Sequence, residues 1–369
     1  MNMASGARLV LLTAGLLAAN VLPGWAQNRI ETSAGPVVVT KMAGGLDEPW
    51  GIGFLPDGRF LVTERPGRLM LFPAAGGEGR PVAGVPEVAE VGQGGLLDVM
   101  VPRDFAASRE VWLSYARADT SGAGTALGVG RLSDDGTSLT DFRVVFAAPG
   151  TDGGNHFGSR IVEAPDGTIF LTAGERGNAP LAQDPMRPQG KVLHFNRDGS
   201  PATTNTGMMA GVHSMGHRNP QGAALDGEGQ LWVVEHGAQG GDELNRIKAG
   251  ANYGWPVIAY GEDYGGGKIG EGTARDGMEQ PVMYWDPSIA PSGLMFYQGD
   301  LFPAWKGDVF TGSLKFDYLS RLDPDAGYAE ERISGPETGR VRDVVEGPDG
   351  AIWFLSVIEG AAYRMTPAE

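Results

Sequence analysis

The chain has 369 residues and a formal net charge of −16 at pH 7, from 29 Lys and Arg against 45 Asp and Glu. Such an acidic surface repels phosphate backbones, so nucleic-acid binding is disfavoured. The absence of Cys excludes disulfides, thiol catalysis and thiolate metal sites, and it leaves any metal to oxygen ligands or to the five His. The 59 Gly and 25 Pro disfavour long helices, because both residue types destabilise a helix interior.

The N-terminus is typical of an export signal. Arg8 supplies a positive charge, an apolar stretch runs from Leu9 to Leu22, and Gly24-Trp25-Ala26 precedes Gln27 as a cleavage site. This stretch is shorter than the roughly 20 residues that a membrane-spanning helix needs, and an uncleaved anchor is the alternative. We therefore expect a signal peptide over residues 1–26, a periplasmic or secreted mature protein, and no stable membrane insertion.

One hairpin pattern recurs along the chain. Residues 54–62 contain an apolar segment, a tight Asp-Gly turn and a second apolar segment, and the same arrangement, with an Asp-Gly or Glu-Gly turn, returns at 162–171, 225–233 and 345–354. Gly supplies the positive φ that such a tight turn needs. Two weaker copies fill the gaps, at 105–115 and 302–311. The six turns lie near residues 57, 109, 166, 228, 307 and 349, with a mean spacing of about 58 residues.

Radial repetition of four-stranded units suits this period. We predict an all-β fold, a six-bladed β-propeller with four-stranded antiparallel blades, which occupies residues 27–369 as one catalytic domain. A β-sandwich or several small β-domains is the alternative, but neither explains why the same hairpin returns at quasi-regular intervals. The longest interval predicts an insertion between about residues 238 and 300, a segment rich in Gly, Tyr and Trp.

The connections between repeats carry polar residues that a propeller would gather at one end of its channel. Gln93 lies in one such connection and His156 in another, the Gly-rich segment 152–158. Histidine titrates near neutrality and suits the removal of a proton from a hydroxyl, and a structural hydrogen-bonded His is the alternative. Arg218 and Asn219 place a guanidinium beside an amide, which suits carboxylate or carbonyl oxygens. An inter-blade ion pair is the alternative for Arg218.

The loop 235–243 is rich in acidic residues and glycine. Carboxylates beside exposed main-chain carbonyls are the oxygen ligands that Ca²⁺ requires. The spacing does not match an EF-hand, and a solvated acidic turn is the alternative.

Three basic residues follow in the last quarter of the chain. Lys315, one of only six Lys, ends an apolar segment. Arg340 and Arg342 alternate along a predicted strand and are expected on one face of it. Two adjacent cations need an anion between them, so the pair predicts a bound polyanion such as a small tricarboxylate. An Arg pair held by Asp343 and Glu346 is the alternative.

With these residues in order, the chain resembles the soluble pyrroloquinoline-quinone-dependent glucose and aldose sugar dehydrogenases, and more closely the shorter aldose sugar dehydrogenase branch. The matching segments are residues 92–97, 155–156, 216–222, 235–245, 314–315 and 340–343. The resemblance covers the whole mature chain. It implies a six-bladed propeller in which the quinone (PQQ) and the substrate stack over the central channel.

The resemblance also implies roles for individual residues. His156 would be the general base, and Arg218 would polarise the reacting quinone carbonyl. Arg218 and five other residues would contact PQQ: Gln93, Asn219, Lys315, Arg340 and Arg342. Main-chain oxygens of Gly237 and Ala238 would hold the Ca²⁺ that touches the cofactor. Glu243 and Tyr253 would belong to a second, structural Ca²⁺ site.

The chain departs from the family pattern in three respects. Ala238 replaces a proline of the glucose enzyme, which matters little because a main-chain oxygen is the ligand. Asn155 replaces the aspartate expected before the catalytic His, so we expect different support for that imidazole. The chain lacks room for the long loops through which the glucose enzyme dimerises, so we expect a monomer.

The implied function is PQQ- and Ca²⁺-dependent oxidation of aldose sugars at the anomeric carbon to lactones. His156 would take the hydroxyl proton, the hydride would pass to the quinone, and a soluble or membrane-linked acceptor would collect the electrons. One alternative is a Ca²⁺-dependent lactonase-type propeller hydrolase, with a metal at the channel bottom and no need for the Arg340/Arg342 pair. The other is a secreted, non-catalytic propeller that binds sugars or proteins.

Overall fold

The computed structural model describes Met1 and residues 29–368. The expected signal peptide, apart from Met1, and its cleavage site at Ala26 therefore lie outside the described residues. Within the described part of the chain, no helix is long and apolar enough to cross a membrane.

Six antiparallel sheets form six blades, which confirms the predicted propeller. Blade 1 contains β3 (Pro49–Phe54), β4 (Phe60–Glu64), β5 (Arg68–Phe72) and β6 (Arg80–Val82). Blade 2 contains β7 (Leu96–Met100), β8 (Glu110–Asp119), β9 (Gly122–Leu132) and β10 (Leu139–Ala147). Blade 3 contains β11 (Ile161–Glu163), β12 (Ile169–Ala173), β13 (Lys191–Phe195) and β14 (Val212–Met215).

The second half of the chain repeats this arrangement. Blade 4 contains β15 (Pro220–Leu225), β16 (Leu231–Glu235), β17 (Asp242–Arg246) and β18 (Met283–Trp285). Blade 5 contains β19 (Pro291–Phe296), β20 (Val309–Ser313), β21 (Tyr318–Asp323) and β22 (Ala329–Ile333). Blade 6 contains β23 (Val341–Glu346), β24 (Ile352–Ser356) and β25 (Ala361–Pro367), and it is completed from the N-terminal end of the described chain.

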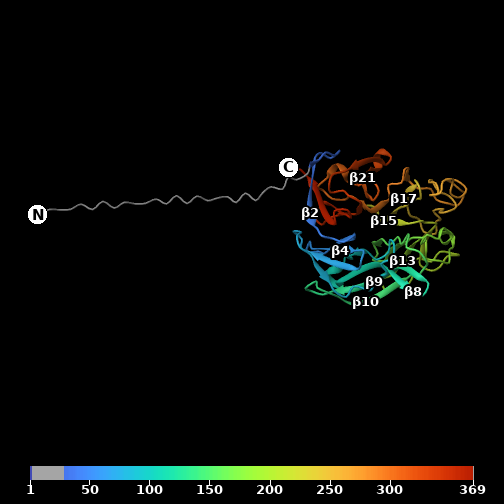
Figure 1. Ribbon diagram of the computed structural model, residues 1–369, viewed down its shortest axis with the longest axis horizontal. Helices are drawn as coiled ribbons and strands as arrows, with labels where there is room; N and C mark the ends of the chain where they lie inside the picture. The colour runs from blue at the N-terminus through green and yellow to red at the C-terminus, as the bar shows by residue number, and fades with distance from the viewer. Residues whose placement is uncertain (2–28, 369) are drawn as a thin grey trace.

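Blade 6 closes the ring by pairing both ends of the chain. Strand β2 (Val37–Ala43) runs antiparallel to β25, with Val39 opposite Met365, and the short β1 (Arg29–Ile30) pairs with β2. In Figure 1 the blue β2 lies beside the red C-terminal strands. Because the chain continues from β2 through residues 44–48 into β3 of blade 1, the pairing of β2 with β25 closes the ring between the first and last blades.

All six predicted hairpin turns join the first and second strands of a blade. The two weaker copies are weaker because a short helix occupies each turn: α1 (Phe105–Ser108) in blade 2 and the 3₁₀ helix η2 (Pro303–Trp305) in blade 5. Two further 3₁₀ helices lie in other connections, η1 (Ala179–Gln183) and η3 (Pro324–Ala326). Asp-Gly pairs therefore mark three turns and Glu228-Gly229 a fourth, and helical turns replace them in the other two.

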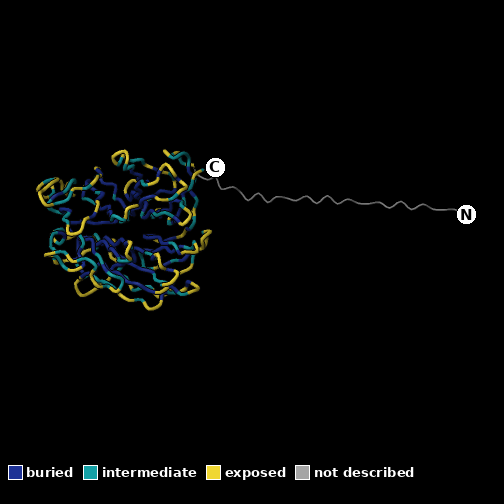
Figure 2. The backbone as a smooth tube through the Cα atoms, turned by 180° about the vertical axis from the view of Figure 1, so that it is seen from behind, coloured by how far each residue is buried: buried dark blue, intermediate teal, exposed yellow. Residues whose placement is uncertain are grey.

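The hydrophobic core lies between neighbouring blades. The strands are buried along most of their length, and Figure 2 shows buried segments inside the molecule with exposed segments around its outline. Between blades 1 and 6, for example, Phe60 packs edge-on against Trp353 with ring centroids 5.1 Å apart. The predicted insertion is confirmed: residues 247–282 separate β17 from β18 in blade 4.

Candidate active site

Two adjoining cavities lie at the ends of the blades opposite the hairpin turns. One has a volume of about 520 Å³ and is lined by Arg340, Arg342 and Trp50, and we call it the basic cavity. The other has a volume of about 740 Å³ and is lined by His156 and Arg218, and we call it the wide cavity. Both share a wall formed by Gln93, His236, Ala290 and Lys315, so they form one continuous depression.

The structure brings most of the predicted site residues to this depression. Gln93, His156, Arg218, Gly237, Ala238, Lys315, Arg340 and Arg342 line one or both cavities. Glu243 and Tyr253 line a third cavity of about 20 Å³, whose wall also includes Gly237 and Ala238. Asn219 is the exception: it is buried and is not among the residues that line these cavities.

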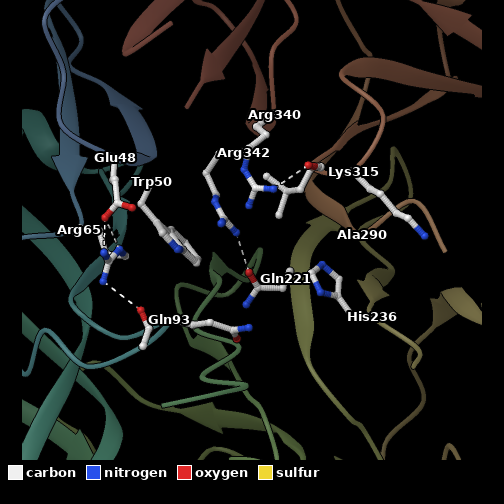
Figure 3. A pocket seen from close by; sticks show the side chains of 12 residues that line it. Glu48, Trp50, Arg65, Gln93, Gln221, His236, Ala290, Lys315, Arg340 and Arg342 are labelled. Atoms are coloured by element: carbon white, nitrogen blue, oxygen red, sulfur yellow. Dashed lines mark hydrogen bonds and ion pairs between the residues drawn. The ribbon is translucent and has the colours of Figure 1, made fainter. Parts of the chain in front are cut away.

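Three cations of the basic cavity lack acidic partners among residues 29–368. The Arg340 guanidinium donates to the main-chain oxygen of Leu314 at 2.9 Å, and Arg342 Nη1 donates to Gln221 Oε1 at 2.9 Å. Lys315 Nζ lies 5.1 Å from the ring centroid of Phe316. Figure 3 shows Arg342 directed towards Gln221, while Lys315 points away from Arg342. The basic cavity thus carries uncompensated positive charge in an acidic protein.

The alternative account of the Arg340/Arg342 pair does not hold. The Asp343 carboxylate binds Arg160, and the Glu346 carboxylate accepts hydrogen bonds from the main chain at Gln298 and Gly299. Neither acid is therefore used to neutralise the pair. A fourth cation of the cavity, Arg65, does have its charge balanced, by Glu48.

Arg342 is held in an electrostatically unfavourable position. Burial, together with the neighbouring Arg160 and Arg340 guanidinium groups, lowers the pKa of Arg342 to about 9. Its Nε is buried and has no hydrogen-bond partner among the described residues. A bound anion would offset the repulsion between these guanidinium groups. It would also accept a hydrogen bond from Nε of Arg342, and such charge-assisted hydrogen bonds are strong.

A buried ion cluster lies beneath Arg342. Arg160 Nη1 contacts Asp343 Oδ1 at 3.0 Å and Asp98 Oδ1 at 3.2 Å, and its guanidinium lies 4.2 Å from the ring centroid of Trp50. Arg160 Nη2 also donates to the main-chain oxygen of Arg342 at 2.8 Å. These residues come from blades 1, 2, 3 and 6. The cluster therefore fixes the floor of the basic cavity by joining blades that are distant in sequence.

His156 is oriented by a buried carboxylate. Nδ1 of His156 lies 2.8 Å from Oε1 of Glu175, whose side chain is 2% exposed. Because a carboxylate can only accept, the proton of the neutral imidazole resides on Nδ1, and Nε2 carries a free lone pair. His156 lines the wide cavity, so Nε2 is the nitrogen that can accept a proton there.

The main chain around His156 is also fixed. Its amide N–H donates to Gln93 Oε1 at 2.8 Å, and its φ is +56°. A Cβ on Gly174 would come within 2.2 Å of the His156 main-chain oxygen, so only glycine allows this approach. The Gly-rich sequence around His156 and Gly174 is therefore required by the fold, and it presents the imidazole to the cavity.

Main-chain oxygens hold the Arg218 guanidinium, which makes no ion pair within residues 29–368. Its Nη1 donates to the oxygens of Gly237, at 2.5 Å, and of His236, at 3.3 Å. Its own amide donates to Glu235 Oε2 at 2.7 Å, and its buried Nε has no partner among the described residues. The main-chain contacts, and not the inter-blade ion pair that was the alternative, hold Arg218. The charge of its guanidinium therefore remains available to a ligand.

His236 forms part of the wall between the two cavities and is neutral. Burial and the nearby Arg342 and Arg218 charges lower the pKa of His236 to about 3. Its Nε2 donates to the main-chain oxygen of Pro291 at 2.9 Å, since a carbonyl only accepts. Nδ1 is then an acceptor for the Asn219 amide at 3.5 Å. Asn219 therefore supports the wall from behind.

The predicted calcium loop is a tightly folded segment whose conformation depends on glycine. Gly240 has a φ of +79°, and a Cβ there would lie 2.6 Å from the Asp286 carboxylate. Burial and the neighbouring Glu235 and Asp242 carboxylates raise the pKa of Glu243 to about 8. The hydroxyl of Tyr253 is engaged with the main chain at Arg246 and Lys248, so only its main-chain oxygen is available as a ligand. The donor set is thus mainly carbonyl oxygen, which suits Ca²⁺.

Sequence reasoning gave no role to several residues of this site, among them Trp50, Arg160, Glu175, Gln221 and His236. Glu175 had a recognisable signal, because it follows the second strand of a repeated hairpin, and the equivalent strands in blades 1 and 4 end in Glu64 and Glu235. His236 stands in the acidic loop that the sequence did single out. Trp50 lies near the start of a first strand and carries no motif. Gln221 lies in the segment 216–222, which the sequence did single out, but no role was predicted for it.

The architecture is that of a β-propeller enzyme whose site lies where the blade connections meet. Within that class, a family model described as Glucose / Sorbosone dehydrogenase matches residues 46–364. The match covers most of the chain, so the protein belongs to this family of oxidoreductases.

Individual relatives agree with the family match. The chain is 44% identical over 324 residues to the aldose sugar dehydrogenase YliI of Escherichia coli, which covers 84% of this chain and 87% of that protein. It is 25% identical over 397 residues to quinoprotein glucose dehydrogenase B of Acinetobacter calcoaceticus, with 84% and 83% covered.

Two solved structures have the same fold. The apo-form of the soluble aldose sugar dehydrogenase from Escherichia coli aligns with a TM-score of 0.84 at 41% identity, covering 90% of this chain and 100% of that one. The PQQ-bound form of an aldose sugar dehydrogenase from Streptomyces coelicolor aligns with a TM-score of 0.75 at 28% identity, covering 89% and 98%.

Proposed function

We propose that this protein oxidises aldose sugars at the anomeric carbon to lactones, with PQQ and Ca²⁺ as cofactors. One observation carries the proposal: a histidine with a free Nε2, supported by Glu175, shares a depression with the unpaired cations Lys315, Arg340 and Arg342. A proton acceptor beside an anion-binding cavity is what the oxidation of a hydroxyl by an acidic cofactor needs.

The residues present fit a triply acidic quinone. The buried Nε atoms of Arg218 and Arg342 lack partners within residues 29–368, and the three cations of the basic cavity lack counter-ions there. A tricarboxylate would satisfy both deficits through charge-assisted hydrogen bonds. The aligned Streptomyces coelicolor enzyme is described as PQQ-bound, which supports this choice of anion. When bound, the quinone supplies a two-electron acceptor for the hydride of the anomeric carbon.

The protein's own groups manage the proton and the charge. Nε2 of His156 takes the proton of the anomeric hydroxyl while the C–H bond of the same carbon breaks, so the sugar loses one proton and one hydride and becomes the lactone. The Glu175 carboxylate stabilises the imidazolium that forms. The Arg218 guanidinium, fixed by two main-chain oxygens, stabilises the negative charge that develops on a bound acceptor.

Calcium would bind at the loop that contains Gly237 and Ala238. Main-chain oxygens of Gly237 and Ala238 would hold the ion that touches the cofactor. Glu243 and Tyr253, which line the adjoining small cavity, would belong to a second, structural Ca²⁺ site. Three neighbouring carboxylates, Glu235, Asp242 and Glu243, raise the local demand for positive charge. The structural ion would supply that charge, and the cofactor-linked ion would supply Lewis-acid polarisation of a bound carbonyl.

The remaining expectations belong to the same proposal. The protein would be exported by its residues 1–26, with residues 27–369 forming the catalytic domain of a periplasmic or secreted monomer. A soluble or membrane-linked acceptor would remove the electrons.

The lactonase-type alternative receives less support from the channel. The buried carboxylates of Asp98 and Asp343 both bind Arg160, so neither is free to hold a metal there. A purely binding propeller would not require the unpaired cations of the basic cavity.

The test begins with protein treated with a chelator and passed through gel filtration. Reduction of an artificial electron-accepting dye by glucose is then followed with PQQ, with Ca²⁺, with both and with neither. We expect turnover only with both, and a lactone as the product. Full activity of the stripped protein, no activity with both cofactors present, or hydrolysis of a lactone in place of sugar oxidation would contradict the proposal.

A further inference from the structure

A buried arginine supports the segment that carries His156, and the proposed chemistry does not use it. Arg176 is 2% exposed and makes no ion pair within the part of the chain that the structure describes. Burial lowers the pKa of its guanidinium to about 10, although the neighbouring Glu175 carboxylate opposes this shift. A buried charge is tolerated only where hydrogen bonds compensate for the lost water. The partners of Arg176 therefore indicate what this residue holds in place.

Three main-chain oxygens accept hydrogen bonds from Arg176. Nη1 donates to the oxygen of Asn155, and Nη2 donates to the oxygens of Gly153 at 3.0 Å and Ala123 at 3.3 Å. Ala123 lies in β9 of blade 2, whereas the other two belong to the segment 152–158, which precedes blade 3. A planar guanidinium can contact three carbonyls at once, because its donors are fixed in a fork. Arg176, which follows β12 of blade 3, thus ties this segment to both blades.

The conformation of the segment is unusual and needs such support. His156 and Arg176 both adopt left-handed backbone conformations, with φ of +56° and +64°, although neither is glycine. Such residues persist only where the surrounding structure holds them, and they are concentrated at functional sites. The Arg176 guanidinium also covers the ring of Phe157, with Cζ 3.2 Å from the ring centroid. Arg176 therefore contacts the residues on both sides of His156, namely Asn155 and Phe157.

Glu175 and Arg176 act on different parts of the same histidine. The Glu175 carboxylate contacts Nδ1 of the His156 ring, whereas the Arg176 side chain binds the main chain that leads to it. The amide of Arg176 also donates to the His156 main-chain oxygen at 3.3 Å. Arg176 is not among the residues that line the three cavities, so any effect on the reaction must pass through other residues.

We propose that Arg176 is a positioning residue for the sugar oxidation, because it fixes the main chain that places Nε2 of His156 against the substrate hydroxyl. The inference rests on the proposed function. Glu175 sets the tautomer and orientation of the imidazole ring, and Arg176 sets the place of the residue that carries this ring. A displacement of about 1 Å can slow a reaction about 10²-fold, so loss of this support slows proton removal.

The first test compares Arg176→Gln with the unmodified protein, both loaded with PQQ and Ca²⁺. Reduction of the bound quinone by saturating glucose is followed by its absorbance in a single turnover, which measures the chemical step. We expect this rate to fall about 10- to 100-fold, while the half-saturating glucose concentration and the dissociation constant for PQQ stay within about twofold. Arg176→Lys keeps the charge without the fork and should recover part of the loss.

Arg109→Gln is the matched control, because Arg109 shares the backbone conformation and the kinds of contact of Arg176. Its φ is +58°, and its guanidinium lies 4.7 Å from the Phe105 ring centroid. It donates to the main-chain oxygens of Leu132 and Ser133. It follows α1 at the hairpin turn of blade 2, at the end of the blade opposite the cavities. We expect Arg109→Gln to lower the urea midpoint of unfolding without changing the rate of quinone reduction.

The second test asks whether Arg176 acts through His156. Arg176→Gln is combined with His156→Ala, and because the base is then already absent, the rate of quinone reduction should fall by less than about a further twofold. A full further loss in the double variant would show that Arg176 acts through another group.

Three other results would overturn the proposal: an unchanged rate in Arg176→Gln, an equal loss of rate in Arg109→Gln, or weaker binding of PQQ by the same factor as the loss of rate. If Arg176→Gln does not fold, Arg176→Lys takes its place in both tests, and its rate must fall at least about threefold. Failure of the proposed function is a different result, because the unmodified protein would then not reduce the quinone with glucose when both cofactors are present.

Discussion

Glu175 Oε1 lies 2.8 Å from Nδ1 of His156, and the amide of Glu175 donates to the main-chain oxygen of Arg218 at 2.9 Å. One buried residue therefore links the proposed base to the main chain of the proposed electrostatic group. Sequence reasoning expected the support of this imidazole to change, because Asn155 replaces an aspartate. The structure supplies that support from blade 3 through a residue 19 positions further along the chain.

Replacing His156 by Ala removes the proposed base without removing a cation of the basic cavity. We expect turnover to fall by about 10²–10⁴-fold, the usual contribution of a positioned general base, while the affinity for PQQ stays within about twofold. Dye reduction measures the first quantity and titration with PQQ the second. Unchanged turnover would remove His156 from the mechanism.

Glu175→Gln tests the carboxylate behind the base. The amide can donate to Nδ1 and so favour the imidazole tautomer whose Nε2 already carries a proton, and it cannot stabilise the imidazolium. We expect kcat to fall by about 10²-fold with little change in KM for glucose. Glu175→Asp is the matched control, because it keeps the charge, and it must recover part of the loss. Equal kcat values for Glu175→Gln and the unmodified protein would contradict this role.

Arg342→Gln removes one cation from the basic cavity. We expect the dissociation constant for PQQ to rise about 10- to 100-fold, because a charge-assisted hydrogen bond contributes about 1.5–3 kcal/mol. Fluorescence or absorbance titration of the Ca²⁺-loaded protein measures it. Arg332→Gln is the control, since Arg332 is exposed and pairs with Glu330 away from both cavities. The same affinity in both variants would argue against an anion at Arg342.

Arg160→Met leaves Asp98 and Asp343 buried without their cation. Breaking a buried ion cluster in this way costs about 3–5 kcal/mol of unfolding free energy, which denaturant unfolding measures. Converting both acids to Asn in the Arg160→Met background removes the stranded charges and must recover part of the loss. If Arg160→Met alone costs less than about 1 kcal/mol, the cluster does not hold the blades together.

The sequence was sufficient to predict the blades because each hairpin is a local feature. An Asp-Gly turn between two apolar segments specifies its own pairing, and even the two turns that form α1 and η2 kept the flanking strands recognisable. The pairing of β2 with β25 has no such local signal, since its partners are separated by most of the chain. It follows from closure of the ring, which periodicity alone does not specify.

The residues of the candidate site likewise fall into those that a local sequence pattern reveals and those that it does not. Residues in Gly-rich connections, such as His156 and Arg218, were predicted because glycine and a charged side chain together are conspicuous in a sequence. Arg160, Glu175 and Trp50 were missed because they lie in or beside apolar strands, where a polar residue acquires its role only from the blade opposite. Asn219 was predicted to contact PQQ, and that role stays a prediction, because in the structure its buried side chain lies behind His236 and lines none of the three cavities.

From the position of His213 we predict that the folded protein becomes less stable in acid. Its half-buried ring packs edge-on against Phe170, and burial, with repulsion from His194 and His217, lowers the pKa of His213 to about 4 from an ordinary value of 6.5. Between these pH values the unfolded chain binds more protons than the folded one, so the unfolding free energy falls as the pH falls through this window. The contribution of this one group is at most about 3 kcal/mol.

His213→Gln isolates this effect, because the other titrating groups remain in both proteins. The difference in unfolding free energy between the unmodified protein and the variant should shrink steadily as the pH is lowered from 7 to 4, since the native imidazole resists protonation and the glutamine does not titrate. Urea unfolding at several pH values measures it. A difference that stays constant over this range would show that the folded protein accommodates a charged imidazole at this position.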